Sequence, residues 1–318
     1  MLSRTAANLY WIGRYLERAD FLARILDATL RMTALPDSYG GASGTEWASA
    51  IATVGAAESF VEHRGDPSAA PDEASVANWV AFDPANPSSI VSCIDVARTN
   101  ARDVRTALTT ELWEIINGAW NDLRRFQTGP RDRESLGRFI DWTKAVCLSS
   151  DGAIHRTMLR NDAYWFLQLG SAIERADNTA RILDVKYHLL LPESEHVGGS
   201  IDYFQWSTIL RGVSALTAYR WCYRDTIRPW LVADLLILNP SMPRSLACCY
   251  AVASQTLEAM SEAHGHRGPG QRHAATVLAQ LRSRRIEDIF QSGLHEFVQD
   301  FLIDNNQLGS LIAEQYLL

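Results

Sequence analysis

The 318-residue sequence predicts an all-α fold, a multi-helical bundle built from two tandem repeats related by a pseudo-two-fold axis. Apolar residues recur at spacings of three and four along most of the chain, and sustained alternation of period two is scarce. A segment near the start also reappears in the second half. We therefore expect two helical units, residues 1–152 and 153–318, packed as one compact domain.

The repeat is clearest between residues 13–27, GRYLERADFLARILD, and residues 170–184, GSAIERADNTARILD, which share ten of fifteen residues. A second pair of segments, VANWVAFDPANPSSI from residue 76 and VADLLILNPSMPRSL from residue 232, lies at nearly the same separation. A weaker match pairs Trp47 with Trp206. Several matches in the same order favour duplication of one unit over chance similarity.

The elements follow from this periodicity, with loops rich in Gly, Pro, Asp or Ser between several of them. The segment 13–27 falls in the first long helix, and its copy falls in the seventh. In chain order, helices are expected over residues 4–34, 46–62, 74–80, 89–109, 112–126, 135–148, 161–190, 201–224, 226–236, 243–262, 272–281 and 286–304. The clearest loops are expected over residues 36–44, 65–71, 129–133, 192–199 and 265–270.

Composition limits the partners and locations that fit this chain. The net charge is −7 and lysine occurs only at positions 144 and 186, so a basic nucleic-acid footprint is not expected. No apolar stretch approaches the roughly 20 residues of a membrane helix, and no signal-peptide pattern follows the first residue. The five cysteines form no C-x-x-C pair and are expected to be buried thiols. We expect a soluble, cytoplasmic protein without membrane or nucleic-acid partners, and its oligomeric state stays open.

The repeated segment carries a narrow polar seam on an otherwise apolar helix, which predicts that the helix is largely buried. On a helical wheel centred on Glu17, the seam comprises Tyr10, Gly13, Arg14, Asp20, Phe21 and Arg24, with Arg18 at its border. The second copy retains Gly170, Glu174, Arg175, Asp177 and Arg181. Because the same charged residues persist in both copies, we interpret the seam as more than a solvated face.

Buried charges need partners, since an unpaired charge in a low dielectric costs several kcal/mol. Within each helix, residues four apart are neighbours, so we expect the pairs Asp20–Arg24 and Asp177–Arg181. Across the two helices, we expect Glu17 to meet Arg175 or Arg181, and Glu174 to meet Arg18 or Arg24. Gly13 and Gly170 would allow the two backbones to approach closely.

Two interpretations of the seam stay open at this point. It can be a structural ion-pair network that fixes helix register, or it can form the floor of a pocket for a charged ligand such as a peptide or an amino acid. Arginine holds carboxylates bidentately and glutamate accepts from an amine, so either chemistry fits these residue types.

Metal and cofactor sites are not expected. Di-metal helical bundles use Glu-x-x-His, whereas Glu17 is followed by Asp20 and Glu174 by Asp177. A carboxylate-only magnesium site would place the cation beside arginines, which repel it. Phosphate-binding glycine motifs are missing from the sequence, so a nucleotide site within the chain is not expected.

Three segments carry a resemblance to a known family: MLSRTAANLYWIGRYLERADFLARILD at the start, NPSSIVSCIDVARTNARDVR from residue 86 and IFQSGLHEFVQDFL from residue 289. The chain resembles the bacterial Alpha-E domain family over essentially its whole length. The resemblance implies an all-helical protein with repeated acidic positions. It also implies an association with a circularly permuted ATP-grasp ligase and a transglutaminase-like peptidase that make or trim peptides.

Two functions of different class follow. The first is a helical accessory protein that binds a separate ATP-grasp-type ligase, its peptide substrate or both, in peptide or amino-acid modification. The second is an enzyme of the same pathway, in which Glu17 or Glu174 acts as general base in a pocket between the repeats.

Overall fold

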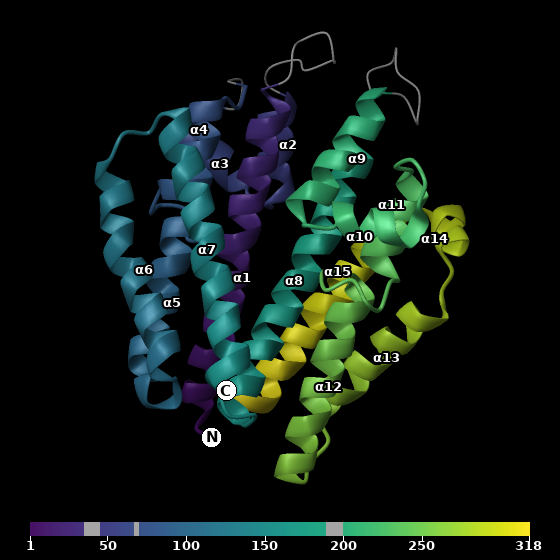
Figure 1. The fold of residues 1–318 in the computed structure, drawn as a ribbon. Coiled ribbons are helices and arrows are strands. Elements are labelled where there is room, and N and C mark those ends of the chain that lie inside the picture. The colour runs from purple at the N-terminus through teal and green to yellow at the C-terminus, as the bar shows by residue number, and fades with distance from the viewer. Residues whose placement is uncertain (35–44, 67–69, 189–199) are drawn as a thin grey trace.

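The computed structural model describes residues 1–34, 45–66, 70–188 and 200–318, and over these ranges it is helical and contains no strand (Figure 1). The predicted all-α class is therefore confirmed. The predicted loops 36–44 and 192–199 lie outside the described residues. None of the helices in the described ranges combines the length and apolarity that crossing a membrane requires.

The helices of the first half begin with one long helix and end with another. They are α1 (Ser3–Met32), α2 (Thr45–Thr53), α3 (Ala57–Arg64), α4 (Glu73–Ala77), the π-helical turn η2 (Asn78–Phe82), α5 (Ile90–Asp103), the 3₁₀ turn η3 (Arg105–Ala107), α6 (Thr110–Thr128) and α7 (Arg133–Thr157). Helix α7 runs across residue 152, the predicted end of the first unit.

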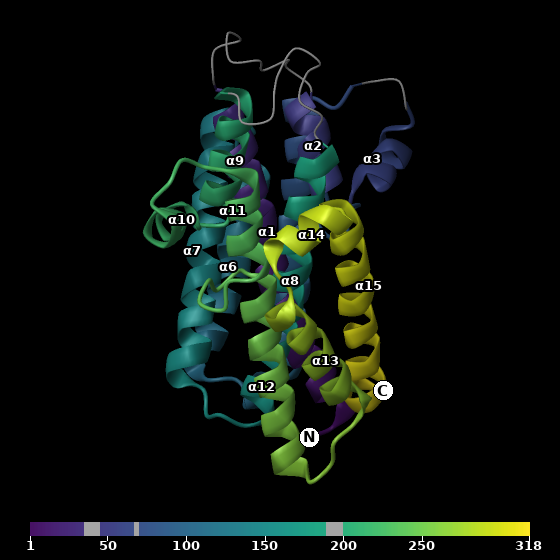
Figure 2. The same ribbon diagram turned by 90° about the vertical axis from the view of Figure 1, so that its right-hand side faces the viewer.

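The second half also opens on a long helix. Its elements are α8 (Asp162–His188), α9 (Ser200–Gly212), α10 (Leu216–Tyr223), α11 (Pro229–Ile237), α12 (Leu246–His264), α13 (Pro269–Ser283), α14 (Ile286–Ser292), α15 (Leu294–Ile312) and the π-helical turn η4 (Ala313–Leu317). Figure 2 shows that the two chain ends lie at the same end of the molecule, where η4 packs against α1.

Helices α1 and α8 form the centre of the bundle. They pack against each other along their length, with α5 and α7 against α1 and with α12 and α15 against α8 (Figure 1). Apolar residues surround α1: Leu9 and Ile12 belong to one buried cluster, and Leu22 and Leu26 belong to a second. A helix that is apolar on most sides must be buried, so the sequence itself explains why α1 is central.

Helices α5 and α12 begin in the same way, after the two similar proline-containing loops. Ser89 precedes α5 and its hydroxyl accepts from the backbone N–H of Ser92, while Ser245 precedes α12 and accepts from Cys248. Serine at this position satisfies an amide that the helix itself leaves unpaired. Each capping serine therefore stabilises the start of its helix.

Three predicted helices are wrong in that each is split in two. Residues 46–62 form α2 and α3, residues 201–224 form α9 and α10, and residues 286–304 form α14 and α15. The breaks contain Gly55 (φ +67°), Ser214 (φ 57°) and Gly293 (φ 102°), a backbone region in which a right-handed helix cannot continue. The predicted helix over residues 135–148 is also longer, because α7 continues to Thr157.

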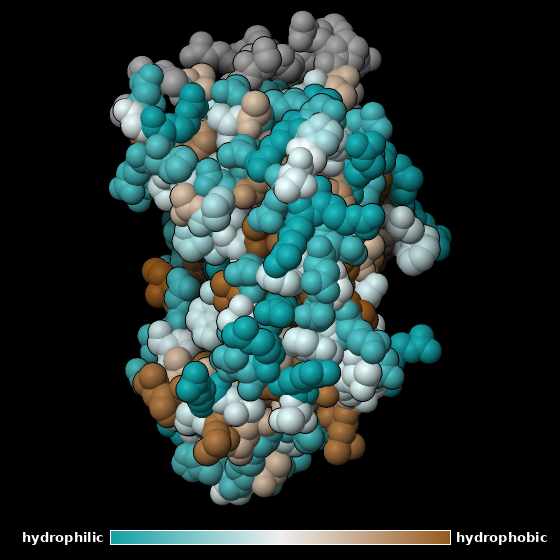
Figure 3. Space-filling model, turned by 90° about the vertical axis from the view of Figure 1, so that its left-hand side faces the viewer, coloured by the Kyte–Doolittle hydropathy of each residue, from teal (hydrophilic) through white to brown (hydrophobic). Residues whose placement is uncertain are grey.

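The surface contrasts with this apolar interior. Figure 3 views the molecule from the side of α6, and this face is mostly hydrophilic, with apolar residues scattered among polar ones. Scattered apolar residues are normal on a protein surface. The large apolar content of the chain is therefore accounted for mainly by the two buried clusters around α1 and α8.

Candidate functional site

The two copies of the repeated segment face each other where α1 crosses α8. A Cβ atom on Gly13 would overlap the backbone carbonyl oxygen of Leu167, and one on Gly170 would overlap that of Tyr10. Only glycine permits this approach, as the sequence predicts. The close contact brings the charged seams of both helices into the same layer.

Glu17 of α1 is held by arginines from two other parts of the chain. Its Oε2 accepts from Arg175 Nη2 of α8 at 2.6 Å, and its Oε1 accepts from Arg244 Nη1 at 2.8 Å. The Glu17 side chain is 6% exposed. Of the two predicted partners across the helices, Arg175 makes the contact.

Glu174 of α8 has a matching arrangement with residues of α1. Its Oε2 accepts from Arg14 Nε at 2.6 Å and its Oε1 accepts from Arg18 Nε at 2.6 Å. Arg18 also donates from Nη1 to the hydroxyl of Ser88, at 3.3 Å. Of the two partners predicted for Glu174, Arg18 makes the contact. Arg14 donates a second hydrogen bond to Glu174, which the sequence did not predict.

Arg24 and Arg181, the other predicted partners, do not reach the glutamates in this structure. Arg24 Nε donates to Asp20 at 2.7 Å, and Arg181 Nε donates to Asp177 at 2.6 Å, so both act within their own helices. The structure thus contains both predicted i,i+4 pairs. The nine predicted site residues all take part in ion pairs along the contact of α1 with α8. These pairs form separate groups, since Glu174, Glu17 and Asp177 each bind different arginines.

Arg244 is the member of the ion-pair network that the sequence did not predict. It lies in the loop before α12, and besides Glu17 it binds Asp20, with Nη2 to Oδ2 at 2.6 Å. In the pairing of residues 76–90 with residues 232–246, Arg244 matches Ser88, which contacts Arg18. That match was a usable signal, because it places both residues at the same point before a capping serine.

The arginines keep the buried glutamates ionised. Burial raises the pKa of Glu17, but the charges of Arg175 and Arg244 and their hydrogen bonds outweigh it and lower the pKa to about 2. The pKa of Glu174 is also lowered, because Arg14 and Arg18 outweigh its burial. The neighbouring thiol of Cys147 has a pKa raised well above its usual value by burial, so it stays protonated.

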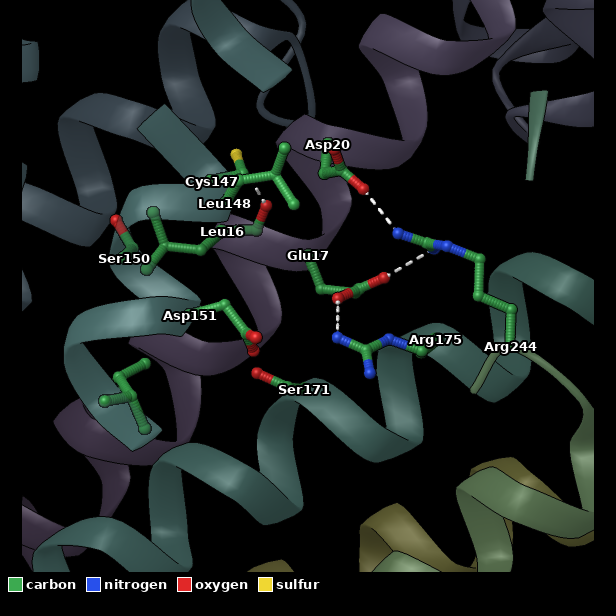
Figure 4. A pocket seen from close by; sticks show the side chains of 11 residues that line it. Leu16, Glu17, Asp20, Cys147, Leu148, Ser150, Asp151, Ser171, Arg175 and Arg244 are labelled. Carbon is green, nitrogen blue, oxygen red and sulfur yellow. Dashed lines mark hydrogen bonds and ion pairs between the residues drawn. The ribbon is translucent and has the colours of Figure 1, made fainter. Parts of the chain in front are cut away.

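A small cavity of about 80 Å³ opens beside Glu17, between α1, α7 and α8 (Figure 4). Two of its lining residues have a buried polar atom without a hydrogen-bond partner among the described residues, namely Asp20 Oδ1 and Arg175 Nε. Such unpaired groups are uncommon in protein interiors. The lining residues are Leu16, Glu17, Asp20, Cys147, Leu148, Ser150, Asp151, Ile154, Ser171, Arg175 and Arg244.

The cavity does not resemble a metal centre. Among the described residues, no group of three or more His, Cys, Asp or Glu side chains is arranged to hold a metal ion. Both carboxylate oxygens of Glu17 and one of Asp20 already accept from arginines, so these side chains do not offer a free set of metal ligands.

Comparison with known proteins places the chain in a family. Residues 1–317 match Alpha-E, described as a predicted alpha-helical domain with a conserved ER motif. The chain belongs to the Alpha-E family. No curated protein and no solved structure matches it.

The ER motif can be located in this Alpha-E protein. Glu-Arg occurs twice in the sequence, as Glu17-Arg18 and Glu174-Arg175. In the structure, the arginine of each dipeptide binds the glutamate of the other, at 2.6 Å in both cases. The two dipeptides therefore form one reciprocal contact between α1 and α8.

Proposed function

We propose that this Alpha-E protein is a helical accessory protein that binds its ligand without catalysing a reaction. In this proposal it acts beside a separate ATP-grasp-type ligase in peptide or amino-acid modification. The resemblance to the family supports the ligase and the pathway. The observation that carries the non-catalytic role is the state of the two glutamates, each of which already accepts from two arginines.

The alternative is an enzyme in which Glu17 or Glu174 is a general base. One observation favours it, because Glu17 lies in the wall of the cavity. A general base works best when its pKa is near the operating pH. With a pKa of about 2, the Glu17 carboxylate has little tendency to take a proton at neutral pH, so we rank this alternative second.

We also propose that the fold arose by duplication, with residues 1–152 and 153–318 as two units of one compact domain related by a pseudo-two-fold axis. The reciprocal contacts support this proposal. Gly13 meets Leu167 and Gly170 meets Tyr10, and these four residues are equivalent in pairs under the sequence repeat. A location in the reducing cytoplasm is part of the proposal, and the buried free thiols of Cys93 and Cys249 are compatible with it.

Affinity capture from the native host, followed by mass spectrometry, tests the partner. The expected result is recovery of an ATP-grasp-type ligase with the tagged wild-type chain and not with an unrelated tagged helical protein. Failure to recover any such ligase under conditions where the bait is folded would contradict the proposal.

Glu17→Gln separates the accessory role from the general-base role. The assay follows pathway product formed per folded molecule, at a temperature where circular dichroism shows the variant to be folded. An accessory role predicts that product persists in proportion to folded protein. Loss of product with an intact fold would favour the general base.

A further inference from the structure

We propose that the cavity beside Glu17 binds the free α-amino end of an amino acid or a peptide, with the ammonium facing its carboxylates and the adjoining carbonyl oxygen facing Arg175. This inference rests on the proposed binding function and names the chemistry of the ligand. It uses residues of α7 that the charge seam does not include.

Most of the polar side chains in the wall of the cavity are hydrogen-bond acceptors. The hydroxyl of Ser150 donates to the carbonyl of Val146 at 2.9 Å, and that of Ser171 donates to the carbonyl of Gly13 at 3.3 Å. Because these hydroxyl protons are used, both oxygens offer only lone pairs to a ligand. The carboxylates of Glu17, Asp20 and Asp151 add further acceptors.

One of these acceptors is buried and lacks a partner. Asp20 is 4% exposed, and its Oδ1 makes no hydrogen bond among the described residues, although its Oδ2 binds Arg24 and Arg244. A buried carboxylate oxygen without a donor is costly. An ammonium group supplies three donors and would satisfy such acceptors.

The charge balance also favours a cation. The wall itself holds the carboxylates of Glu17, Asp20 and Asp151 and the guanidinium groups of Arg175 and Arg244. Glu17 and Asp20 are bound by these two arginines, and Asp20 is also bound by Arg24, which lies outside the wall. Asp151 has a weaker partner in the described structure, His155 at 3.5 Å, which is charged only when protonated. The wall therefore retains negative charge at Asp151, beside the opening.

The unpaired donor of Arg175 indicates which chemical group lies next to the ammonium in the ligand. Arg175 Nε is buried and has no partner, and Nη2 is the atom of this guanidinium that binds Glu17. A carbonyl oxygen two bonds from the amine-bearing carbon can accept from such a donor. An α-amino group next to a carbonyl has this arrangement, whereas a lysine side chain does not.

The size and position of the cavity fit an end group rather than a whole peptide. A volume of about 80 Å³ holds roughly five water-sized groups, enough for a nitrogen, its carbon and a carbonyl. The side chains of Leu148 and Asp151 are 63% and 49% exposed, so they lie where the cavity meets solvent. The remainder of the ligand would leave the cavity past these two residues.

Calorimetric titration of the full chain tests the inference with three probes. L-alaninamide carries an amine and a carbonyl and should bind saturably, while N-acetyl-L-alaninamide lacks the amine and should not bind. L-alanine distinguishes a free amino acid from the amino end of a peptide as the ligand. If L-alanine binds more tightly than L-alaninamide, the ligand is a free amino acid, and if it binds more weakly, the ligand is a peptide end. No saturable binding of either amine, or equal binding of the acetylated probe, would overturn the inference.

Asp151→Asn is the matched variant, because Asp151 is half-exposed and its change should leave the fold intact. It should weaken L-alaninamide binding about tenfold or more, since the ammonium loses a charged acceptor and keeps at most a neutral amide oxygen. Asp141→Asn removes the same charge from an exposed position of α7 outside the cavity and should bind as wild type does. Unchanged binding by Asp151→Asn would contradict the proposed site.

The capture experiment keeps the two proposals distinguishable. Ligase recovery without amine binding would overturn the cavity assignment and leave the accessory function standing. Amine binding without ligase recovery would overturn the ligase partnership and leave the cavity assignment standing.

Discussion

Glu17 and Glu174 remain charged inside the bundle because each carboxylate accepts from two guanidinium groups. Desolvation of a single carboxylate costs several kcal/mol, and the paired arginines offset that cost. A buried ion pair need not stabilise a fold more than apolar residues would. Its clearer consequence is that removing one member leaves the others buried and unpaired.

Replacing Glu174 tests this consequence at one residue. Glu174→Gln leaves Arg14 and Arg18 without their counterion, and we expect it to lower the free energy of unfolding by roughly 3 kcal/mol in urea denaturation. Glu134→Gln is the control, because Glu134 is 82% exposed and pairs with Arg138 at the surface. It should change stability by less than about 0.5 kcal/mol, and equal effects of the two variants would contradict the account.

The lowered pKa of Glu17 predicts how stability depends on pH. Its pKa falls from 4.5 to about 2 on folding, so its stabilising contribution is present above pH 4.5 and is lost as the pH falls toward 2. We expect a loss of about 3 kcal/mol from this residue across that interval. Denaturant unfolding of wild type and Glu17→Gln between pH 7 and pH 2 measures it. The variant should lose less stability than wild type, and parallel curves would argue against the shift.

At the scale of helices, the pairing of the seams could be predicted because helical periodicity fixes which side chains share a face. When two copies of one charged pattern face each other, only a few pairings of their glutamates with their arginines are possible. The role of Arg244 could not be predicted in this way, because it lies in a loop whose position depends on how α12 packs. The helix breaks at Gly55 and Gly293 were missed because an isolated glycine does not by itself end a helix.

Gly13 sets the distance between α1 and α8, and its substitution tests that distance. Gly13→Ala places a methyl group against the carbonyl of Leu167, and we expect a loss on the order of 3 kcal/mol in unfolding free energy. The control is Gly137→Ala in α7, where nothing lies within 4 Å of an added Cβ atom. It should be neutral or stabilising by up to about 1 kcal/mol, because alanine favours helix over glycine. A similar response at both positions would mean that the helices are not in close contact.

At the scale of the whole molecule, composition and periodicity were sufficient to predict the all-α class, and the internal repeat predicted that the charged seams of α1 and α8 would meet. The cavity was not predictable, because it depends on Asp151 and Ser150 of α7, outside the repeated segment. Their position follows only from how α7 packs against α1. The sequence therefore predicted the charged layer and offered a pocket as one interpretation of it, but it did not predict the α7 residues that line the cavity.

A double-mutant cycle between Glu17 of α1 and Arg175 of α8 tests the central claim that charge pairs join the two halves. Unfolding free energies are measured at pH 7 for wild type, Glu17→Gln, Arg175→Gln and the double variant. We expect a coupling energy of about 1 to 3 kcal/mol, with the double variant less destabilised than the sum of the two single variants. Additivity within about 0.5 kcal/mol would show that the two side chains do not interact and that this charge pair does not join the two halves.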